Sequence, residues 1–254
     1  MSGRPIPDPG FPGDDGTADP ALSAALQAWV EDEDLEAPVY AGLARARVLV
    51  PVVAVLAEEA PVGPGALRRE KSTDMALVTL VGTDGRRALP VFTSVSSLAA
   101  WRRDARPVPV EAARAALSAA GEGAELLVLD VAGPVTFLVE GPVVAALARG
   151  RQLRPLYADA DVLTAVADAL HPEPTVRSAW LEPVAGADAR LVLVLDAGPD
   201  RPAVASRVAG AVAAAPAVRG AVVRGLQVAV VPPGGNARPD AVELVRSSPP
   251  RPQQ

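Results

Sequence analysis

Residues 70–94 read EKSTDMALVTLVGTDGRRALPVFTS, and this stretch decides the fold prediction. Two apolar runs, residues 75–81 and 87–92, flank Thr83-Asp84-Gly85, a combination typical of a tight turn between strands. The stretch therefore predicts a β-hairpin. Because a hairpin sets the start of its first strand opposite the end of its second, we expect Asp74 and Thr93 to lie close together.

Predicted helices and strands both flank the hairpin in the sequence. The Val- and Leu-rich residues 47–56 predict a buried strand, and Asp19-Pro20 is typical of a helix start. The other elements expected before residue 150 are helices beginning at Pro38 and at Thr93 or Ser94, a helix over residues 110–121, paired strands over 125–130 and 135–140, and a helix over 142–149. Helices and hairpins without regular β–α alternation predict the α+β class, with a mixed, largely antiparallel sheet and flanking helices.

Composition predicts two domains between two tails. Residues 1–20 and 232–254 hold 11 of the 27 prolines, so we expect flexible tails over residues 1–19 and 233–254. A stretch with Gly, Arg and Pro near residues 150–158 separates a first domain, 20–150, from a second, 159–232. The second is expected to be a smaller α+β domain, with helices over 159–170 and 202–215 and strands over 176–184, 191–196 and 227–231.

Acidic charge is concentrated at the front of the chain. The 254 residues carry a net charge of −6, and residues 1–37 alone hold nine acidic residues against one basic residue, Arg4. The remainder has 23 basic and 21 acidic residues, so no strong positive field would draw nucleic acid to it. No apolar run approaches the roughly 18 residues of a membrane span, and residues 1–20 lack a signal-peptide pattern. We expect a cytoplasmic protein without nucleic-acid or membrane partners.

The inventory of reactive side chains excludes several chemistries. The chain has no Cys and one His, which rules out disulfides, thiol nucleophiles and metal sites built from Cys or several His. His171 stands between Leu170 and Pro172 at a predicted helix end, where positive charge is favoured beside the last carbonyl groups of the helix. No phosphate-binding motif is present, so we expect neither a metal nor a cofactor. The acidic run over residues 31–36 is interpreted as a solvated helix end.

Two groups of residues stand out as a candidate binding site. Lys71 is the only lysine beside 23 arginines and lies three residues before Asp74, whose charge would keep the amine protonated. Phe92 and Thr93 end the second hairpin strand, and Trp101 follows within one short helix, so the three would line a pocket. The predicted hairpin brings both groups together.

The leading hypothesis is a non-enzymatic binding or regulatory module with a site at Lys71, Asp74, Phe92, Thr93 and Trp101. The partner would be another protein or a small amino-acid-like ligand, because a zwitterion suits Lys71 and Asp74 acting together. Two alternatives stay open: an enzyme that uses Lys71 with Asp74 or Glu70, and a scaffold that works through oligomerisation. A structural role also stays open, with Lys71 in an exposed salt bridge and Thr93 as a helix cap.

The same residues resemble a known family. The similarity is carried by EKSTDMALV (70–78), DGRRALPVFTS (84–94), LAAW (98–101), RPVPV (106–110) and LLVLDVAGP (126–134). These segments resemble the SseB N-terminal domain in the form common in high-GC Gram-positive bacteria, and the likeness covers residues 20–150. Residues 160–232, with VRSAWL at 176–181, resemble the SseB C-terminal domain more weakly. The family is named for enhanced serine sensitivity on overproduction, so the resemblance implies a fold and assigns no catalytic residue.

Overall fold

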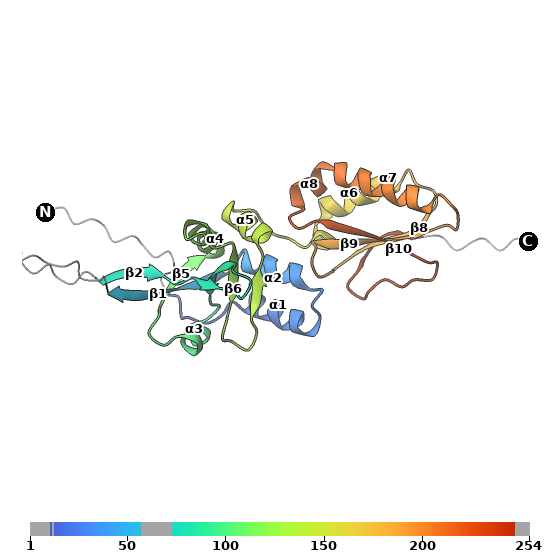
Figure 1. Cartoon of the computed structure of the whole chain (residues 1–254). Helices are drawn as coiled ribbons and strands as arrows, with labels where there is room; N and C mark the ends of the chain where they lie inside the picture. Colours follow the sequence, from blue (N-terminus) through green and yellow to red (C-terminus); the bar gives the residue numbers. More distant parts are fainter. Residues whose placement is uncertain (1–10, 12, 57–72, 247–254) are drawn as a thin grey trace, which may run out of the picture. The chain divides into compact units, whose positions relative to one another are not determined.

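The computed structural model describes residue 11 and residues 13–56 and 73–246 of the chain. Over these residues, helices mix with mostly antiparallel strands, which confirms the predicted α+β class (Figure 1). The described residues divide into two compact units. Unit 1 comprises the residues up to Gln27 and Gly42–Arg151, and unit 2 comprises Ala28–Ala41 and the residues from Gln152 onward. The sequence does not predict that residues 28–41 join unit 2.

Two sheets form unit 1. The first contains β1 (Arg47–Leu56), β2 (Thr73–Leu77) and β5 (Arg106–Glu111) in the antiparallel order β2-β1-β5. The second has the order β3-β4-β6-β7, with β4 and β6 parallel, and comprises β3 (Leu80–Val81), β4 (Arg87–Val91), β6 (Leu126–Leu129) and β7 (Phe137–Val139). Five helices contribute to unit 1, of which α1 and α2 each extend into unit 2: α1 (Pro20–Glu31), α2 (Glu36–Leu43), α3 (Val95–Trp101), α4 (Ala112–Gly121) and α5 (Gly141–Ala148).

The predicted hairpin is correct only at its tip. Leu80 pairs with Ala88 and Val81 with Arg87, so β3 and β4 enclose the expected turn. Residues 73–77, however, pair antiparallel with residues 52–56 of β1. β5 pairs only with residues 47–52 of β1, so β2 supplies the hydrogen-bonding partners that the second half of this strand needs.

Strand β5 is absent from the sequence prediction because its prolines conceal it. Pro107 and Pro109 cannot donate to a sheet ladder, and a central strand does not tolerate them. β5 is an edge strand, in which every second N–H group points away from the sheet, so a proline at such a position removes no hydrogen bond of the ladder. Pro109 lies opposite Leu49. The helix expected from residue 110 consequently begins at Ala112, as α4.

Helix starts follow the predicted capping residues. Asp19 Oδ1 accepts a hydrogen bond of 2.9 Å from the backbone N–H of Leu22 at the start of α1. Ser94 Oγ accepts one of 3.1 Å from the backbone N–H of Ser97 at the start of α3. Both bonds satisfy donors that the first helical turn leaves free, which is why short polar side chains are found at these positions.

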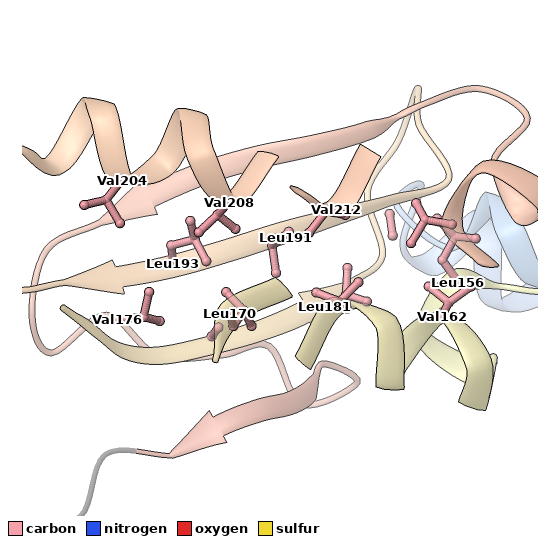
Figure 2. Packing of buried hydrophobic residues seen from close by; sticks show 14 of the residues in the cluster. Leu156, Val162, Leu170, Val176, Leu181, Leu191, Leu193, Val204, Val208 and Val212 are labelled. Carbon is pink, nitrogen blue, oxygen red and sulfur yellow. The ribbon is translucent and has the colours of Figure 1, made fainter. Parts of the chain in front are cut away.

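Unit 2 is a four-stranded sheet in the order β10-β9-β8-β11, covered on one face by helices. Its elements are the short 3₁₀ turn η1 (Leu156–Ala158), α6 (Ala160–Leu170), β8 (Val176–Glu182), β9 (Ala189–Leu195), α7 (Arg201–Ala214), α8 (Pro216–Ala221), β10 (Leu226–Val231) and β11 (Val242–Arg246). Alternate residues of β8 and β9 meet buried residues of α6 and α7, and together they form the core of the unit (Figure 2).

The C-terminal tail predicted from residue 233 is wrong for residues 242–246. These residues form β11, which pairs antiparallel with β8 and has a bulge between Glu243 and Val245. The run VELVR is short and follows a stretch rich in Pro and Gly, so no local pattern marks it as a strand. Its partner lies far away in the sequence, and tertiary pairing decides its structure.

Candidate functional site

The predicted neighbours Asp74 and Thr93 lie far apart. Asp74 pairs with Val55 of β1, whereas Phe92, the residue before Thr93, pairs with Leu49. These two positions on β1 are six residues apart, about 20 Å at the usual rise of a strand. The expected adjacency is therefore wrong, because β2 pairs with β1 and not with β4.

The charged part of the predicted site is described only at Asp74. Lys71 and Glu70 lie outside the described residues. Their pairing with Asp74, and an enzyme that depends on it, therefore stay predictions. What the structure gives is the place of Asp74 in β2, near the end of the pairing with β1.

Thr93 is held by a buried carboxylate that the sequence does not single out. Asp130 Oδ1 accepts a hydrogen bond of 2.9 Å from the backbone N–H of Thr93, and Asp130 Oδ2 accepts one of 2.6 Å from its hydroxyl. Both residues are 5% exposed. Thr93 comes two residues after β4 and Asp130 directly follows the parallel strand β6, so this pair connects the ends of the two strands.

The backbone around Asp130 is shaped to hold this carboxylate. Asp130 has φ +48°, a left-handed conformation that Asp tolerates better than most residues. Its carbonyl accepts a hydrogen bond of 2.7 Å from the N–H of Gly133, where a Cβ atom would come within 2.9 Å of the Asp130 Cβ. The Asp-Val-Ala-Gly sequence is thus a tight turn. A polar residue that ends an apolar strand just before Gly-Pro is the signal that sequence analysis had available.

Arg47 extends the connection from Thr93 to the front of the chain. Its Nη1 donates to the carbonyl of Thr93 at 2.7 Å, and its Nη2 donates to the carbonyl of Thr17 at 2.8 Å and pairs with Asp14. The Arg47 side chain is only 11% exposed. Residues 14–17, part of the predicted flexible tail, are therefore bound to unit 1, and the Thr93 N–H, hydroxyl and carbonyl all have internal partners.

Phe92 and Trp101 differ in their access to solvent. Phe92 is fully buried in a cluster with Leu49, and its ring centroid lies 5.3 Å from that of Trp101. Trp101 is half-buried at the border of this cluster, where Val53 of β1 also packs. Of the three aromatic and hydroxyl residues in the predicted site, only Trp101 has surface that a partner can reach.

Among the described residues, the far half of β1 has one neighbouring strand. Residues 53–56 pair with residues 73–76 of β2, whereas β5 pairs with β1 no further than Val52. Burial also decreases along β1 toward its far end: Val48 and Leu49 are at most 1% exposed, while Val53 is half-buried. We call residues 53–56 and 73–76 the ribbon, with the sequences VAVL and TDMA.

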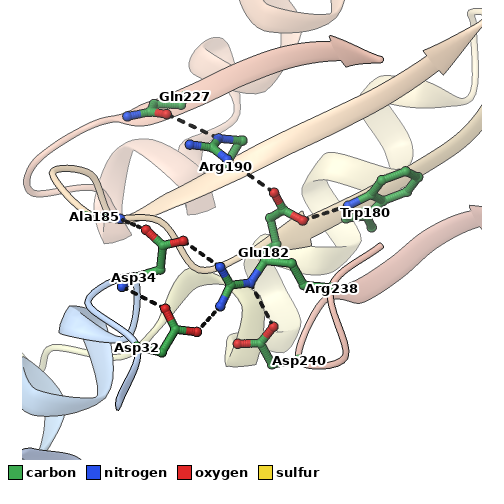
Figure 3. A network of polar contacts seen from close by, with 9 residues as sticks. All are labelled: Asp32, Asp34, Trp180, Glu182, Ala185, Arg190, Gln227, Arg238 and Asp240. Carbon is green, nitrogen blue, oxygen red and sulfur yellow. Dashed lines mark hydrogen bonds and ion pairs between the residues drawn. The ribbon is translucent and has the colours of Figure 1, made fainter. Parts of the chain in front are cut away.

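Unit 2 contains a separate polar network on the sheet face away from the helices (Figure 3). Glu182 is 6% exposed and accepts a hydrogen bond of 2.9 Å from the Trp180 indole, with Arg190 at 3.5 Å. Nearby, Arg238 pairs with Asp34 at 2.5 Å and also with Asp32. These contacts neutralise buried or half-buried charges within the unit.

The acidic run over residues 31–36 is more than a solvated helix end. α1 ends at Glu31, and Arg238 then binds Asp32 and Asp34. Glu36 pairs with Arg224 at 2.5 Å, and this arginine is 7% exposed. The run therefore holds residues 28–41 in unit 2. The sequence conceals this role because Arg238 stands in a segment with the composition of a tail.

His171 lies where the sequence predicts, at the end of α6. It is exposed, and its backbone N–H donates to the carbonyl of Ala167 at 3.1 Å. An open hollow of about 440 Å³ lies beside it, lined also by Leu170, Glu173 and Leu244. The Arg207 guanidinium binds Glu173 at 2.7 and 2.8 Å and holds the pKa of this carboxyl below its usual range. Glu173 is thus held ionised in an ion pair with Arg207.

Among the residues that the structure describes, no group of three or more His, Cys, Asp or Glu side chains is arranged to hold a metal ion. No helix in residues 13–56 and 73–246 has the length and apolar character needed to cross a membrane.

Comparison with known proteins identifies most of unit 1. Residues 22–146 match the family described as the SseB protein N-terminal domain. This match supports the resemblance to the SseB family that the hairpin segments carry. The match ends before residues 160–232, so the C-terminal SseB domain and the Gram-positive type stay predictions. No curated protein and no solved structure matches the chain.

Proposed function

We propose that this chain is a non-enzymatic binding module of the SseB family and that the ribbon, with Trp101 at its base, contacts another protein. One observation carries the proposal: residues 53–56 and 73–76 pair only with each other among the described residues. A two-stranded ribbon alone is marginally stable in water, because a third strand or a packed face is normally needed. A partner protein would supply that missing neighbour.

The composition of the ribbon favours a protein partner. Six of its eight residues are apolar, and the remaining two are Thr73 and Asp74. A strand pair with this composition is more typical of a segment that contacts another protein than of one in water.

Trp101 lies at the base of the ribbon, where it borders the same apolar cluster as Val53. It packs against the Leu49–Phe92 cluster that Val53 also borders, and it stays half-buried. A rigid Trp next to apolar neighbours is the residue type most often found at the energetic centre of a protein interface. Asp74 adds one charged residue to the ribbon, and Lys71 comes two residues before β2 in the sequence.

A quantitative pull-down from a lysate of the cells that make the protein tests this proposal. The baits are wild type, Met75→Asp in the ribbon, Trp101→Ala, and the double variant Lys71→Ala/Asp74→Ala. The matched control is Val81→Asp, because Val81 lies on β3 and is 69% exposed. All baits are first compared by thermal melting.

We expect one protein to be enriched by wild type and by the control and to be lost with Met75→Asp. With that partner purified, Met75→Asp should weaken binding by about tenfold or more, since a carboxylate would be desolvated without a cation. Capture of the same proteins by Met75→Asp as by wild type would contradict the proposal. Heat on titrating serine or another amino acid would instead favour the small-ligand hypothesis.

A further inference from the structure

The outer edge of the unit 2 sheet has no barrier to pairing with another strand. β10 lies at the end of the order β10-β9-β8-β11, and its six residues, LQVAVV, include neither charge nor proline. Its register with β9 runs without interruption from Leu226 to Val231, so no bulge twists the edge away. In the described part of the chain, no strand pairs with its other side. Natural proteins usually block such edges.

The other edge strands of the described residues carry a charge or a proline, or are very short. β2 is five residues long and contains Asp74, β5 contains Pro107 and Pro109, and β11 contains a bulge and the charged residues Glu243 and Arg246. β3 and β7 are two and three residues long, too short to offer a useful edge. β10 is therefore the long uncharged edge of the molecule as described.

The helix above β10 continues the same surface. α7 packs on the core through its buried valines, and its neighbour α6 packs against α7 and β11. Arg207 lies on the flank of α7 that faces this neighbour, since it binds Glu173 just after α6. At 100° per residue, the opposite flank, on the β10 side, consists of small side chains only: Pro202, Ala205, Ala209 and Ala213.

We propose that β10 pairs antiparallel with β10 of a second copy about a two-fold axis, so that two four-stranded sheets become one continuous sheet. The uncharged strand meets its own copy without like-charge repulsion. Pairing at about 4.8 Å would bring the two α7 helices side by side, and small residues allow helices to approach to about 8–10 Å.

The small residues on the flank of α7 favour a second copy of the chain, rather than a strand of another protein, as the partner of β10. An extended peptide would satisfy the edge of β10 and leave the row of alanines uncovered. A second copy brings a helix at the same height above its own β10, which covers this row. Arg201 Nη2 already donates to the carbonyl of Val231 at 3.2 Å, so the pairing is expected over residues 226–230.

Light scattering after size exclusion tests the proposal on the full chain. Wild type should have twice the 25.9 kDa mass of one chain. Val230→Lys on β10 and Ala209→Glu on the α7 flank should each return the mass of one chain. The matched controls are Val81→Lys, at the exposed valine of β3, and Ala203→Glu, on the solvent side of α7, and both should keep the wild-type mass.

Hydrogen exchange on the wild-type protein tests the same pairing without any substitution, so it still applies if a variant fails to fold. The amides of β10 should exchange more slowly as protein concentration rises, while those of the β5 edge stay unchanged. Single-chain mass at every concentration, with β10 exchange independent of concentration, would overturn the proposal. A dimer that survives both Val230→Lys and Ala209→Glu would overturn it too. So would protection of β10 only on adding other proteins.

Discussion

The two ends of β1 differ in how much of their packing and hydrogen bonding unit 1 itself supplies. At the first end, β5 and the bridge to Phe92 flank the strand, Leu49 is 1% exposed, and Arg47 connects Thr93 to the front of the chain. At the other end, residues 53–56 have β2 as their only neighbour among the described residues. Described residues therefore flank the first end on both sides and the second end on one side.

This difference separates two kinds of residue that look alike in sequence. Thr93 and Asp74 both stand at the end of an apolar run, and both resemble site residues. The N–H, hydroxyl and carbonyl of Thr93, however, all form hydrogen bonds with Asp130 or Arg47, whereas Asp74 lies in the ribbon. The comparison predicts that substitutions at the first end change stability and that those in the ribbon change binding.

The largest effect is expected from removing the buried carboxylate. Asp130→Ala leaves the N–H and the hydroxyl of Thr93 buried without an acceptor, which should lower the free energy of unfolding by about 3 kcal/mol. Asp74→Ala, its matched control in the ribbon, should leave it nearly unchanged. Urea unfolding of both variants measures the contrast. Equal losses would mean that the two ends of β1 are structurally equivalent.

The next effect concerns Arg47. Arg47→Ala removes hydrogen bonds to two backbone carbonyls and a mostly buried ion pair with Asp14, so the unfolding free energy should fall by about 2 kcal/mol. Arg102→Ala is the control, because the pair that Arg102 makes with Asp104 is exposed and surface pairs contribute little. Faster proteolysis near residues 14–17 in Arg47→Ala alone would show that this arginine binds the front segment. Unchanged proteolysis would refute it.

A smaller effect is expected at the start of α3. Ser94→Ala removes the side-chain acceptor for the N–H of Ser97 and should cost about 1 kcal/mol of stability. Ser96→Ala, inside the same helix and exposed, should cost less, since alanine suits a helix interior. The two melting temperatures provide the test, and a larger drop for Ser96→Ala would contradict the assignment of Ser94 as the cap.

The smallest change in stability is expected in the ribbon. Met75→Asp should alter the unfolding free energy by no more than about 0.5 kcal/mol, because β1 is the one strand among the described residues that pairs with β2. Native-state hydrogen exchange should show residues 53–56 opening more readily than residues 48–52. Equal protection along the whole of β1 would remove the contrast between its ends.

Local sequence signals predict much of the fold. Asp19 and Ser94 mark helix starts through capping, and the continuous Val and Leu run gives β1 with the bounds that the structure shows. Two strands that escape prediction, β5 and β11, depend on pairing with distant strands, and their Pro-rich or short sequences give no local signal. Long-range pairing also replaces the predicted hairpin partner of β2.

The candidate site is predicted less well for the same reason. The sequence marks Phe92 and Trp101, whose rings do pack together, and Thr93, but it misses Asp130, which binds Thr93 from the end of a parallel neighbour strand. It also misses Arg238, which binds acidic residues far away in the chain. Such contacts follow from topology, and one sequence without its fold cannot reveal them.

Photo-cross-linking in the source cells tests the central claim most directly, namely that the ribbon contacts a partner protein. A photoreactive amino acid is placed at Met75 in the ribbon and, as control, at Val81 on the exposed edge of β3. The proposal predicts a discrete adduct with one protein from position 75 and none from position 81. No adduct at position 75, or the same adducts from both positions, would contradict the claim.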